Sequence, residues 1–170
     1  MQRTQHFMKK INIIKRKIYN FDTVGDKVRQ WQSNGLMVVF TNGCFDLLHY
    51  GHLHYLADAR DIGDKLVVGL NSAASVRRLK GVNRPINDEL TRQYMLASLD
   101  MIDAVVVFEE DTPFNLINMI KPDVLVKGGD WAVEQIVGSD IVLKNGGKVL
   151  SLPFVEGYST TNLETKIRSW

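Results

Sequence analysis

The stretch that decides the fold of this chain is Phe40-Thr41-Asn42-Gly43-Cys44-Phe45-Asp46-Leu47-Leu48-His49-Tyr50-Gly51-His52. It follows an apolar run at residues 36–39 and leads into a stretch with helical spacing, so it predicts a strand, a loop and a helix in that order. The first turn of such a helix points free N–H groups and the positive end of the helix dipole into the loop. We therefore expect this loop to bind a phosphate group.

Two glycines and two histidines strengthen the expectation of a phosphate site. Gly43 is able to take backbone dihedrals that other residues avoid, and Gly51 has no side chain to hold a phosphate away from the backbone. His49 and His52 share one face of the helix, so two donors converge on one anion. A structural pair and half of a zinc site are the alternatives, but no second pair of Cys or His is spaced to complete a zinc site.

Short apolar strands alternate with helical segments along the rest of the chain. We expect strands at residues 36–41, 66–70, 105–108 and 124–126, and a final helix and strand within residues 139–152. Strands that are apolar on both faces are typical of a parallel sheet with helices on either side. The sequence thus predicts an α/β fold, a Rossmann-like three-layer sandwich with a parallel five-stranded sheet. We expect a single domain over residues 20–170, preceded by a basic N-terminal tail at residues 1–19.

The composition is that of a globular protein, with 170 residues, 45% of them hydrophobic, and a formal net charge of +2. No apolar run approaches the length of a membrane-spanning helix, and we expect no membrane partner. The basic residues of the tail favour a solvated segment over a nucleic-acid arm, so no nucleic-acid partner is expected. Cys44 is the only cysteine, which favours a cytoplasmic location, and we expect it to pack under the loop rather than react.

Polar groups also follow the second and fourth predicted strands, at the edge where an open α/β sheet binds its ligands. Arg77 and Lys80 are either a solvated face or a site for a second phosphate. Lys127, Gly129 and Asp130 form a turn after the fourth strand, and they lie where a ligand would bind. Because there is no Gly-x-Gly-x-x-Gly and no P-loop motif, a dinucleotide cofactor and a γ-phosphoryl kinase are disfavoured.

The last helix and Asp46 each allow two interpretations. Ser159, Thr160 and Thr161 precede the helix and are a seat for phosphates, while Thr161 with Glu164 matches the capping box S/T-x-x-E. These two roles are compatible. Asp46 either caps the coming helix, or orients a histidine or holds a substrate hydroxyl.

Separated blocks of the chain resemble the cytidylyltransferase-like nucleotidyltransferases, and among them the heptose 1-phosphate adenylyltransferases. The blocks are residues 41–52, 75–81, 84–85, 127–131 and 159–162. Phe154 stands where the cytidylyltransferases carry an arginine, which fits the heptose group. Ala73 stands where the heptose enzymes usually have an aspartate, which leaves the exact sugar open.

The resemblance implies that AMP is transferred from ATP to D-glycero-β-D-manno-heptose 1-phosphate, with release of pyrophosphate and formation of ADP-heptose for the lipopolysaccharide core. Mg²⁺ would be bound through the nucleotide phosphates, with no metal ligands from the protein. A cytidylyl- or guanylyltransferase acting on another sugar or polyol phosphate, such as glycerol 3-phosphate, is one alternative. A non-catalytic nucleotide-binding module is the other.

The resemblance also implies roles for particular residues. The catalytic residues would be His49, His52 and Lys80. The nucleotide would be bound by Thr41, Asn42, Gly43, Cys44, Phe45, Gly51, Lys127, Gly129, Asp130, Ser159, Thr160 and Thr161. The sugar phosphate would be bound by Asp46, Asn71, Arg77 and Arg92.

A homodimer and an upstream heptose kinase, fused to this domain in some bacteria, complete what the resemblance implies. Arg92 and residues 99–102 are the dimer contact that we expect. They lie on or next to a predicted helix at residues 89–99. Its expected inner face consists of Leu90, Tyr94, Met95 and Leu99.

Overall fold

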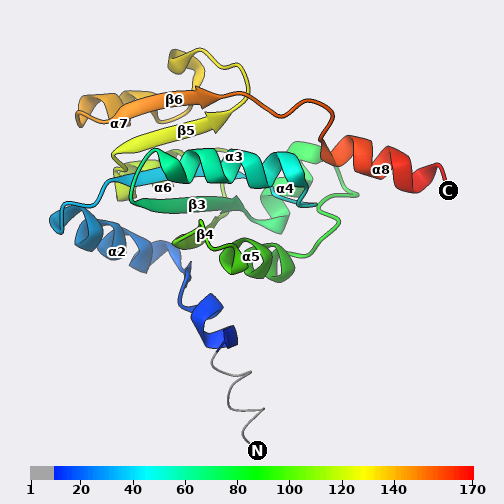
Figure 1. The fold of residues 1–170 in the computed structure, drawn as a ribbon, viewed down its shortest axis with the longest axis horizontal. Helices are drawn as coiled ribbons and strands as arrows, with labels where there is room; N and C mark the ends of the chain where they lie inside the picture. Colours follow the sequence, from blue (N-terminus) through cyan, green and yellow to red (C-terminus); the bar gives the residue numbers. More distant parts are fainter. Residues whose placement is uncertain (1–9) are drawn as a thin grey trace, which may run out of the picture.

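The computed structural model describes residues 10–170, which form a parallel β-sheet with helices on both faces (Figure 1). The sheet has six strands in the order β1-β4-β3-β2-β5-β6, and every neighbouring pair is parallel. The strands are β1 (Ile18–Tyr19), β2 (Val38–Gly43), β3 (Lys65–Asn71), β4 (Ala104–Phe108), β5 (Val124–Gly128) and β6 (Lys148–Leu152). The prediction of a Rossmann-like α/β sandwich is confirmed.

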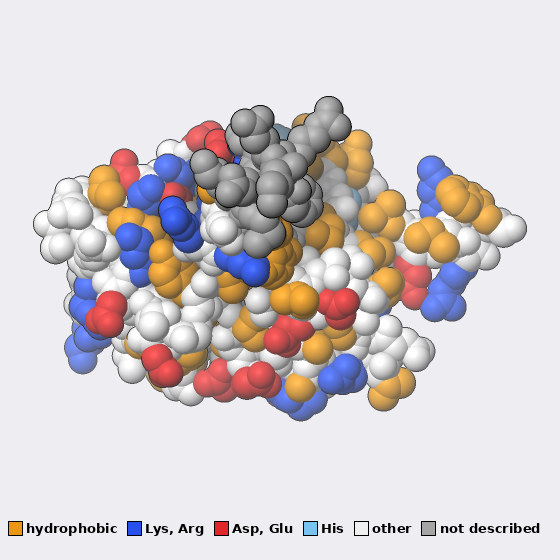
Figure 2. Space-filling model, turned by 90° about the horizontal axis from the view of Figure 1, so that it is seen from below, with side chains coloured by type: hydrophobic (Ala, Val, Ile, Leu, Met, Phe, Trp, Pro, Cys, Tyr) orange, Lys and Arg blue, Asp and Glu red, His pale blue; other side chains and the backbone are white. Residues whose placement is uncertain are grey.

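Helices pack against each face of the sheet through a separate hydrophobic cluster. One face is covered by α3 (Tyr50–Asp61) and α5 (Glu89–Ser98), and the other by α2 (Phe21–Ser33), α6 (Phe114–Ile120) and α7 (Ser139–Lys144). Near the carboxyl ends of the strands lie α4 (Ala73–Lys80), the 3-10 turn η1 (Val133–Gln135) and α8 (Thr160–Arg168). Figure 2 shows that α8 stands off the body of the molecule. No helix of the described residues is long and apolar enough to cross a membrane.

The strand order reverses at the middle of the sheet, next to β2. From β2 the chain builds outward through β3 and β4, and then returns to add β5 and β6 on the opposite side. The loops that leave β2 and β5 therefore lead to opposite faces of the sheet. This leaves a crevice between them at the carboxyl ends of the strands, where open α/β sheets bind ligands.

The number of strands is corrected from five to six, because Ile18 and Tyr19 form the edge strand β1. They pair with Val105 and Val106 of β4, and the Lys17 ammonium donates a hydrogen bond to the Leu99 carbonyl at 3.0 Å. Residues 10–15 are helical. So short a strand carries no alternating pattern, and its pairing depends on the free edge of β4. This part of the expected solvated tail therefore packs on the domain, while residues 1–9 lie outside the described residues.

The helix α5 is found where it was predicted but presents a different face to the core. Leu90, expected inside, is 64% exposed, whereas the Arg92 side chain is fully buried. One terminal nitrogen of Arg92 donates to the carbonyls of Cys44 and Asn71 at 2.9 and 2.8 Å. Arg92 thus connects the carboxyl ends of β2 and β3. We infer that it supports the loop after β2, and that it touches neither a substrate nor a second copy of the chain.

Candidate active site

The glycine at the end of β2, Gly43, and the glycine in the first turn of α3, Gly51, are needed for close packing. It is Phe45, and not Gly43, that takes a positive φ, at 43°. The Phe45 ring folds over Gly43, where an added Cβ would lie 2.9 Å from the ring. A Cβ on Gly51 would lie 3.2 Å from both the His49 Nδ1 and the Tyr158 Cβ. Glycine therefore lets an aromatic ring approach at the first position, and an imidazole at the second.

His49 and His52 lie together, as their spacing predicts. Their rings stack with the centroids 3.8 Å apart, and the Nδ1 of each is buried with no hydrogen-bond partner among the described residues. Burial lowers the pKa of His49, and burial followed by repulsion from His49 lowers the pKa of His52 to about 4. Both rings are therefore neutral at pH 7, and each has one N–H that can be donated to an anion.

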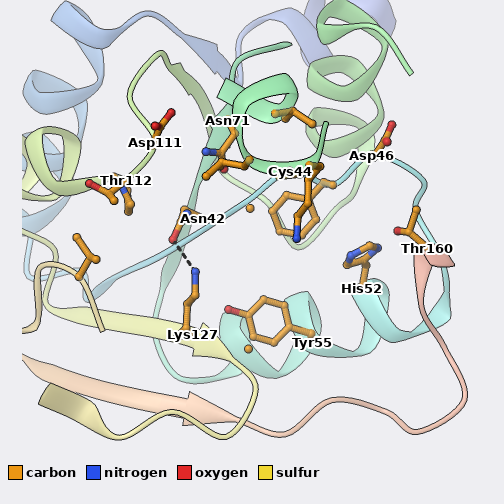
Figure 3. Close-up of a pocket in the computed structure, with 18 of the residues that line it drawn as sticks. Asn42, Cys44, Asp46, His52, Tyr55, Asn71, Asp111, Thr112, Lys127 and Thr160 are labelled. Carbon is orange, nitrogen blue, oxygen red and sulfur yellow. Dashed lines mark hydrogen bonds between the residues drawn. The ribbon is translucent and has the colours of Figure 1, made fainter. Parts of the chain in front are cut away.

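A cavity of about 730 Å³ opens at the carboxyl ends of β2, β3 and β5, and its size suits a small-molecule site (Figure 3). Its walls come from the loop after β2, from α4, from the segments after β4 and β5, and from the start of α8. Many residues predicted from the sequence line this one space. They are Asn42, Gly43, Cys44, Phe45, Asp46, His52, Asn71, Lys80, Lys127, Thr160 and Thr161.

The other predicted residues lie around the cavity and do not form its wall. They are Thr41, His49, Gly51, Arg77, Arg92, Gly129, Asp130 and Ser159. Thr41 is fully buried, and its hydroxyl lies 2.5 Å from the Tyr55 hydroxyl. Arg77 and Asp130 are exposed. The expected contacts of these last two residues with a ligand therefore find no support in the geometry.

The charges around the cavity favour an anionic ligand. The Lys127 ammonium lies 3.5 Å from the Asn42 side-chain oxygen, and burial, followed by the charge of Lys80, lowers its pKa. The carboxylates in the wall already have cationic partners, since Asp46 pairs with Arg84 at 2.9 Å and Asp111 pairs with Arg78 at 2.7 Å. Lys127 and Lys80 are thus left to bind phosphate oxygens, to which an ammonium contributes a point charge.

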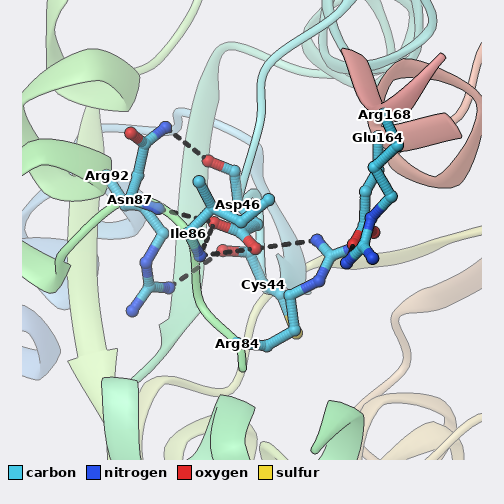
Figure 4. Close-up of polar contacts among 8 residues, drawn as sticks. All are labelled: Cys44, Asp46, Arg84, Ile86, Asn87, Arg92, Glu164 and Arg168. Atoms are coloured by element: carbon cyan, nitrogen blue, oxygen red, sulfur yellow. Dashed lines mark hydrogen bonds and ion pairs between the residues drawn. The ribbon is translucent and has the colours of Figure 1, made fainter. Parts of the chain in front are cut away.

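The carboxylate of Asp46 holds the loop at residues 84–87 and neither caps α3 nor orients a histidine (Figure 4). It accepts hydrogen bonds from the backbone N–H groups of Ile86 and Asn87 at 2.8 and 2.9 Å, and from Arg84. Burial raises the pKa of Asp46, but these bonds outweigh burial and the pKa is lowered. Asp46 is only 5% exposed, so we infer a structural role instead of the expected contact with the sugar phosphate.

The start of α8 differs from the predicted capping box. Ser159 is the N-cap, and its hydroxyl accepts the Asn162 N–H at 3.0 Å. Glu164, which was expected to complete a box with Thr161, forms ion pairs with Arg84 and Arg168 instead. The capping function thus lies two residues earlier, and Thr161 lines the cavity together with Thr160.

Cys44 lines the cavity and is partly buried. Burial raises the pKa of its thiol, and this effect exceeds the opposing influence of Lys80 and Arg92. The thiol is therefore protonated at neutral pH and a weak nucleophile. This agrees with the expectation of an unreactive cysteine, although Cys44 contributes to the wall and does not lie beneath it.

Several residues that line the cavity were not among the predicted site residues. They include Tyr55, Arg84, Thr112, Trp131, Gln135 and Phe154, of which Arg84, Trp131 and Phe154 entered only through the family resemblance. Tyr55 lies three residues after His52 on α3, and the rule that placed the two histidines on one face would have found it. Thr112, Trp131 and Phe154 follow strand ends, which is also a readable signal. Arg84 has no such signal, because its partners are distant in the sequence.

Comparison with known proteins agrees with this geometry. The cytidylyltransferase-like family model matches residues 40–164. The chain is 54% identical over 153 residues to the bifunctional protein HldE of Geotalea uraniireducens (strain Rf4), and 55% identical over 151 residues to that of Geobacter metallireducens. These matches cover 90% and 89% of this chain, which spans 31% of the length of each relative.

A solved structure is also similar, the lipopolysaccharide core biosynthesis protein from Thermoplasma volcanium GSS1. It superposes with a TM-score of 0.58 at 27% sequence identity, and the match covers 74% of this chain and 100% of that protein. The crevice at the strand ends, the stacked histidines and the family model that spans them all agree. This chain belongs to the cytidylyltransferase-like family of nucleotidyltransferases.

Proposed function

We propose that this chain transfers AMP from ATP to D-glycero-β-D-manno-heptose 1-phosphate, which gives ADP-heptose and pyrophosphate. The observation that carries the proposal is the cavity itself. It combines His52, whose neutral ring stacks on that of His49 outside the wall, two ammonium groups that have no carboxylate partner among residues 10–170, and the N-terminus of α8. The similarity to HldE proteins, and to a protein named for lipopolysaccharide core biosynthesis, supports a heptose phosphate as the acceptor.

The reaction needs no strong general base. The second pKa of a sugar phosphate is about 6, so the acceptor oxygen is already ionised at neutral pH. This oxygen attacks the α-phosphorus of ATP, a new P–O bond forms, and the bond to the bridging oxygen of pyrophosphate breaks. What the protein must do is bring two anions together and stabilise the charge that develops during the transfer.

The side chains of the cavity divide this work. We assign the oxygens of the α- and β-phosphates to the N–H groups of His52, which lines the cavity, and of His49, which stacks on it. Lys80, on α4, would hold the phosphate of the sugar. Lys127 would neutralise the triphosphate, and Thr160 would bind its terminal part at the start of α8.

Other residues of the cavity wall suit the two remaining parts of the substrates. Trp131 and Phe154 lie next to the glycine pair at residues 128–129, where flat apolar surface and open backbone favour a nucleotide base. Thr112 and Gln135 contribute hydroxyl and amide groups, which hydrogen-bond sugar hydroxyls. Phe154 also leaves no cation at the position where the cytidylyltransferases carry an arginine.

We also propose that Mg²⁺ enters on the nucleotide. Among residues 10–170 no group of three or more His, Cys, Asp or Glu side chains is arranged to hold a metal ion. The nearby carboxylates of Asp46 and Asp111 are paired with arginines. A metal ion carried by the phosphates would supply further neutralisation of the departing pyrophosphate. A cytoplasmic location, a homodimer and a kinase that supplies the heptose 1-phosphate complete the proposal.

The test is pyrophosphate release with Mg²⁺ from ATP, CTP or GTP, each combined with heptose 1-phosphate or glycerol 3-phosphate. We expect turnover only when ATP is combined with heptose 1-phosphate. Turnover with another pair would retain the nucleotidyl transfer but overturn the assigned substrates. Nucleotide binding without turnover in any combination would favour the non-catalytic module.

A further inference from the structure

Helix α8 brings Thr160 and Thr161 to the cavity but has almost no packing of its own. None of its residues is buried, and Ile167 is 59% exposed. The segment before it, at residues 153–158, is mostly exposed and contains Gly157 with a φ of +82°. In Figures 1 and 2 the helix projects from the body at the edge of the sheet where the strands end. Something other than a hydrophobic core must therefore hold its first turn at the cavity.

Arg84 makes the polar connection between α8 and the rest of the site (Figure 4). One terminal nitrogen donates to the Asp46 carboxylate at 2.9 Å, and the other donates to the Glu164 carboxylate. The side chains of Arg84, Asp46 and Glu164 are 18%, 6% and 28% exposed, so water screens these pairs less than it screens pairs on the open surface. Backbone N–H groups hold the Asp46 carboxylate in place, so Arg84 has a fixed ion-pair partner.

We propose that Arg84 and Glu164 are positioning residues that clasp α8 against the phosphate loop and so set the affinity for the nucleoside triphosphate. The proposal deepens the function above, since it takes the cavity to be a nucleotide site. The clasp acts on binding, because it fixes the first turn of α8 before the ligand arrives. It does not touch the reacting atoms, and the rate of the chemical step should be nearly independent of it.

The chain offers a matched pair of substitutions. Glu164→Gln keeps the shape of the side chain but removes the charge that Arg84 holds. Arg168→Gln removes the second partner of the same carboxylate, which lies at 2.8 Å and whose side chain is 73% exposed. Both changes lie on α8, which has no buried residue, so neither disturbs the core of the domain.

Three measurements on the full chain test the clasp. Hydrogen exchange reports how often residues 160–168 open, calorimetry with ATP alone gives its dissociation constant, and pyrophosphate release gives kcat. For Glu164→Gln we expect faster exchange confined to α8 and about fivefold to tenfold weaker ATP binding, with kcat within about twofold of the parent. For Arg168→Gln we expect both values to stay within about twofold.

Unchanged exchange or an unchanged dissociation constant in Glu164→Gln would overturn the proposal, and so would an equal loss in Arg168→Gln. A lower kcat with normal ATP binding would also overturn it, because it would make Glu164 part of the chemical step. Neither the exchange nor the ATP titration needs the acceptor sugar. A failure of the proposed function in the pyrophosphate assay is therefore distinguishable from a failure of the clasp.

Discussion

The two walls of the cavity are built in opposite ways. The wall formed by β2, its loop and α3 rests on the core, in which Thr41 and Arg92 are fully buried and do not line the cavity. On the wall formed by α8, nothing is buried and an ion pair makes the connection. Groups sealed into a core open only when much of the domain unfolds, whereas a peripheral helix can open by itself. We therefore expect the wall formed by β2, its loop and α3 to open rarely, and the wall formed by α8 to open more readily.

The largest effect on turnover should come from His52, on the wall formed by β2, its loop and α3. His52→Ala removes a donor to the phosphate at which the reaction occurs, and such a loss costs about 10²- to 10³-fold in turnover. The measurement is pyrophosphate release at saturating substrates. His54→Ala is the control, because His54 pairs with Asp58 on the exposed side of α3. A loss below about tenfold for His52→Ala would contradict the role that we give it.

The second prediction concerns Arg92, which supports the loop after β2. Arg92→Leu leaves the carbonyls of Cys44 and Asn71 without their donor, and we expect the free energy of unfolding to fall by about 2–4 kcal/mol. Arg29→Leu removes an exposed arginine that pairs with Asp26, and it should cost less than about 0.5 kcal/mol. Urea denaturation measures both. Equal stability of the two variants would mean that Arg92 does not support the loop.

The third prediction is that the free energy of unfolding depends on pH through His52. Because the pKa of His52 is about 4 in the folded chain and about 6.5 in the unfolded chain, the unfolded state binds more protons between these values. Stability should therefore fall as the pH drops from about 6.5 to 4, with a contribution of at most about 1.4 kcal/mol per pH unit from this group.

Urea denaturation at several pH values, in the parent and in His52→Ala, isolates this contribution. The variant should show a shallower loss of stability on acidification. Parallel curves would place the acid sensitivity elsewhere. Because His49 also has a lowered pKa, part of the slope should remain in the variant.

The smallest effect should come from Thr160, on the wall formed by α8. Thr160→Val removes a hydroxyl that faces the cavity, and we expect the KM for ATP to rise about threefold to tenfold. The free energy of unfolding should change by less than about 0.5 kcal/mol, because α8 has no buried residue. Thr165→Val, at an exposed position of the same helix, is the control. A large loss of stability in Thr160→Val would show that α8 belongs to the cooperative core.

Much of this arrangement was readable from local patterns. The apolar strands, the glycine-flanked loop and the i, i+3 spacing of His49 and His52 each depend on neighbours in the sequence, and each was found where it was expected. The rule that parallel strands end at a common edge also brought Lys80, Lys127 and Thr160 to one cavity.

The errors arose where a residue is explained by partners far along the chain. Arg92 was expected at the sugar phosphate and at a dimer contact, as the resemblance implied. Its side chain instead points into the core from α5, where it donates to two carbonyls at the ends of other strands. The edge strand β1 exists because β4 has a free edge. Phe45 takes the positive φ that was expected of Gly43, because its ring packs over the glycine.

The sequence by itself determined the class of fold and the placement of the two histidines side by side, because hydrophobic periodicity and the spacing of loop residues act over a few positions. Only the tertiary structure decided which charged groups meet. Asp46, Arg84 and Glu164 are separated by long stretches of chain, and their contact depends on how the loops pack at the end of the sheet. Pairing over such distances is a property of the folded shape, and no local pattern in the sequence encodes it.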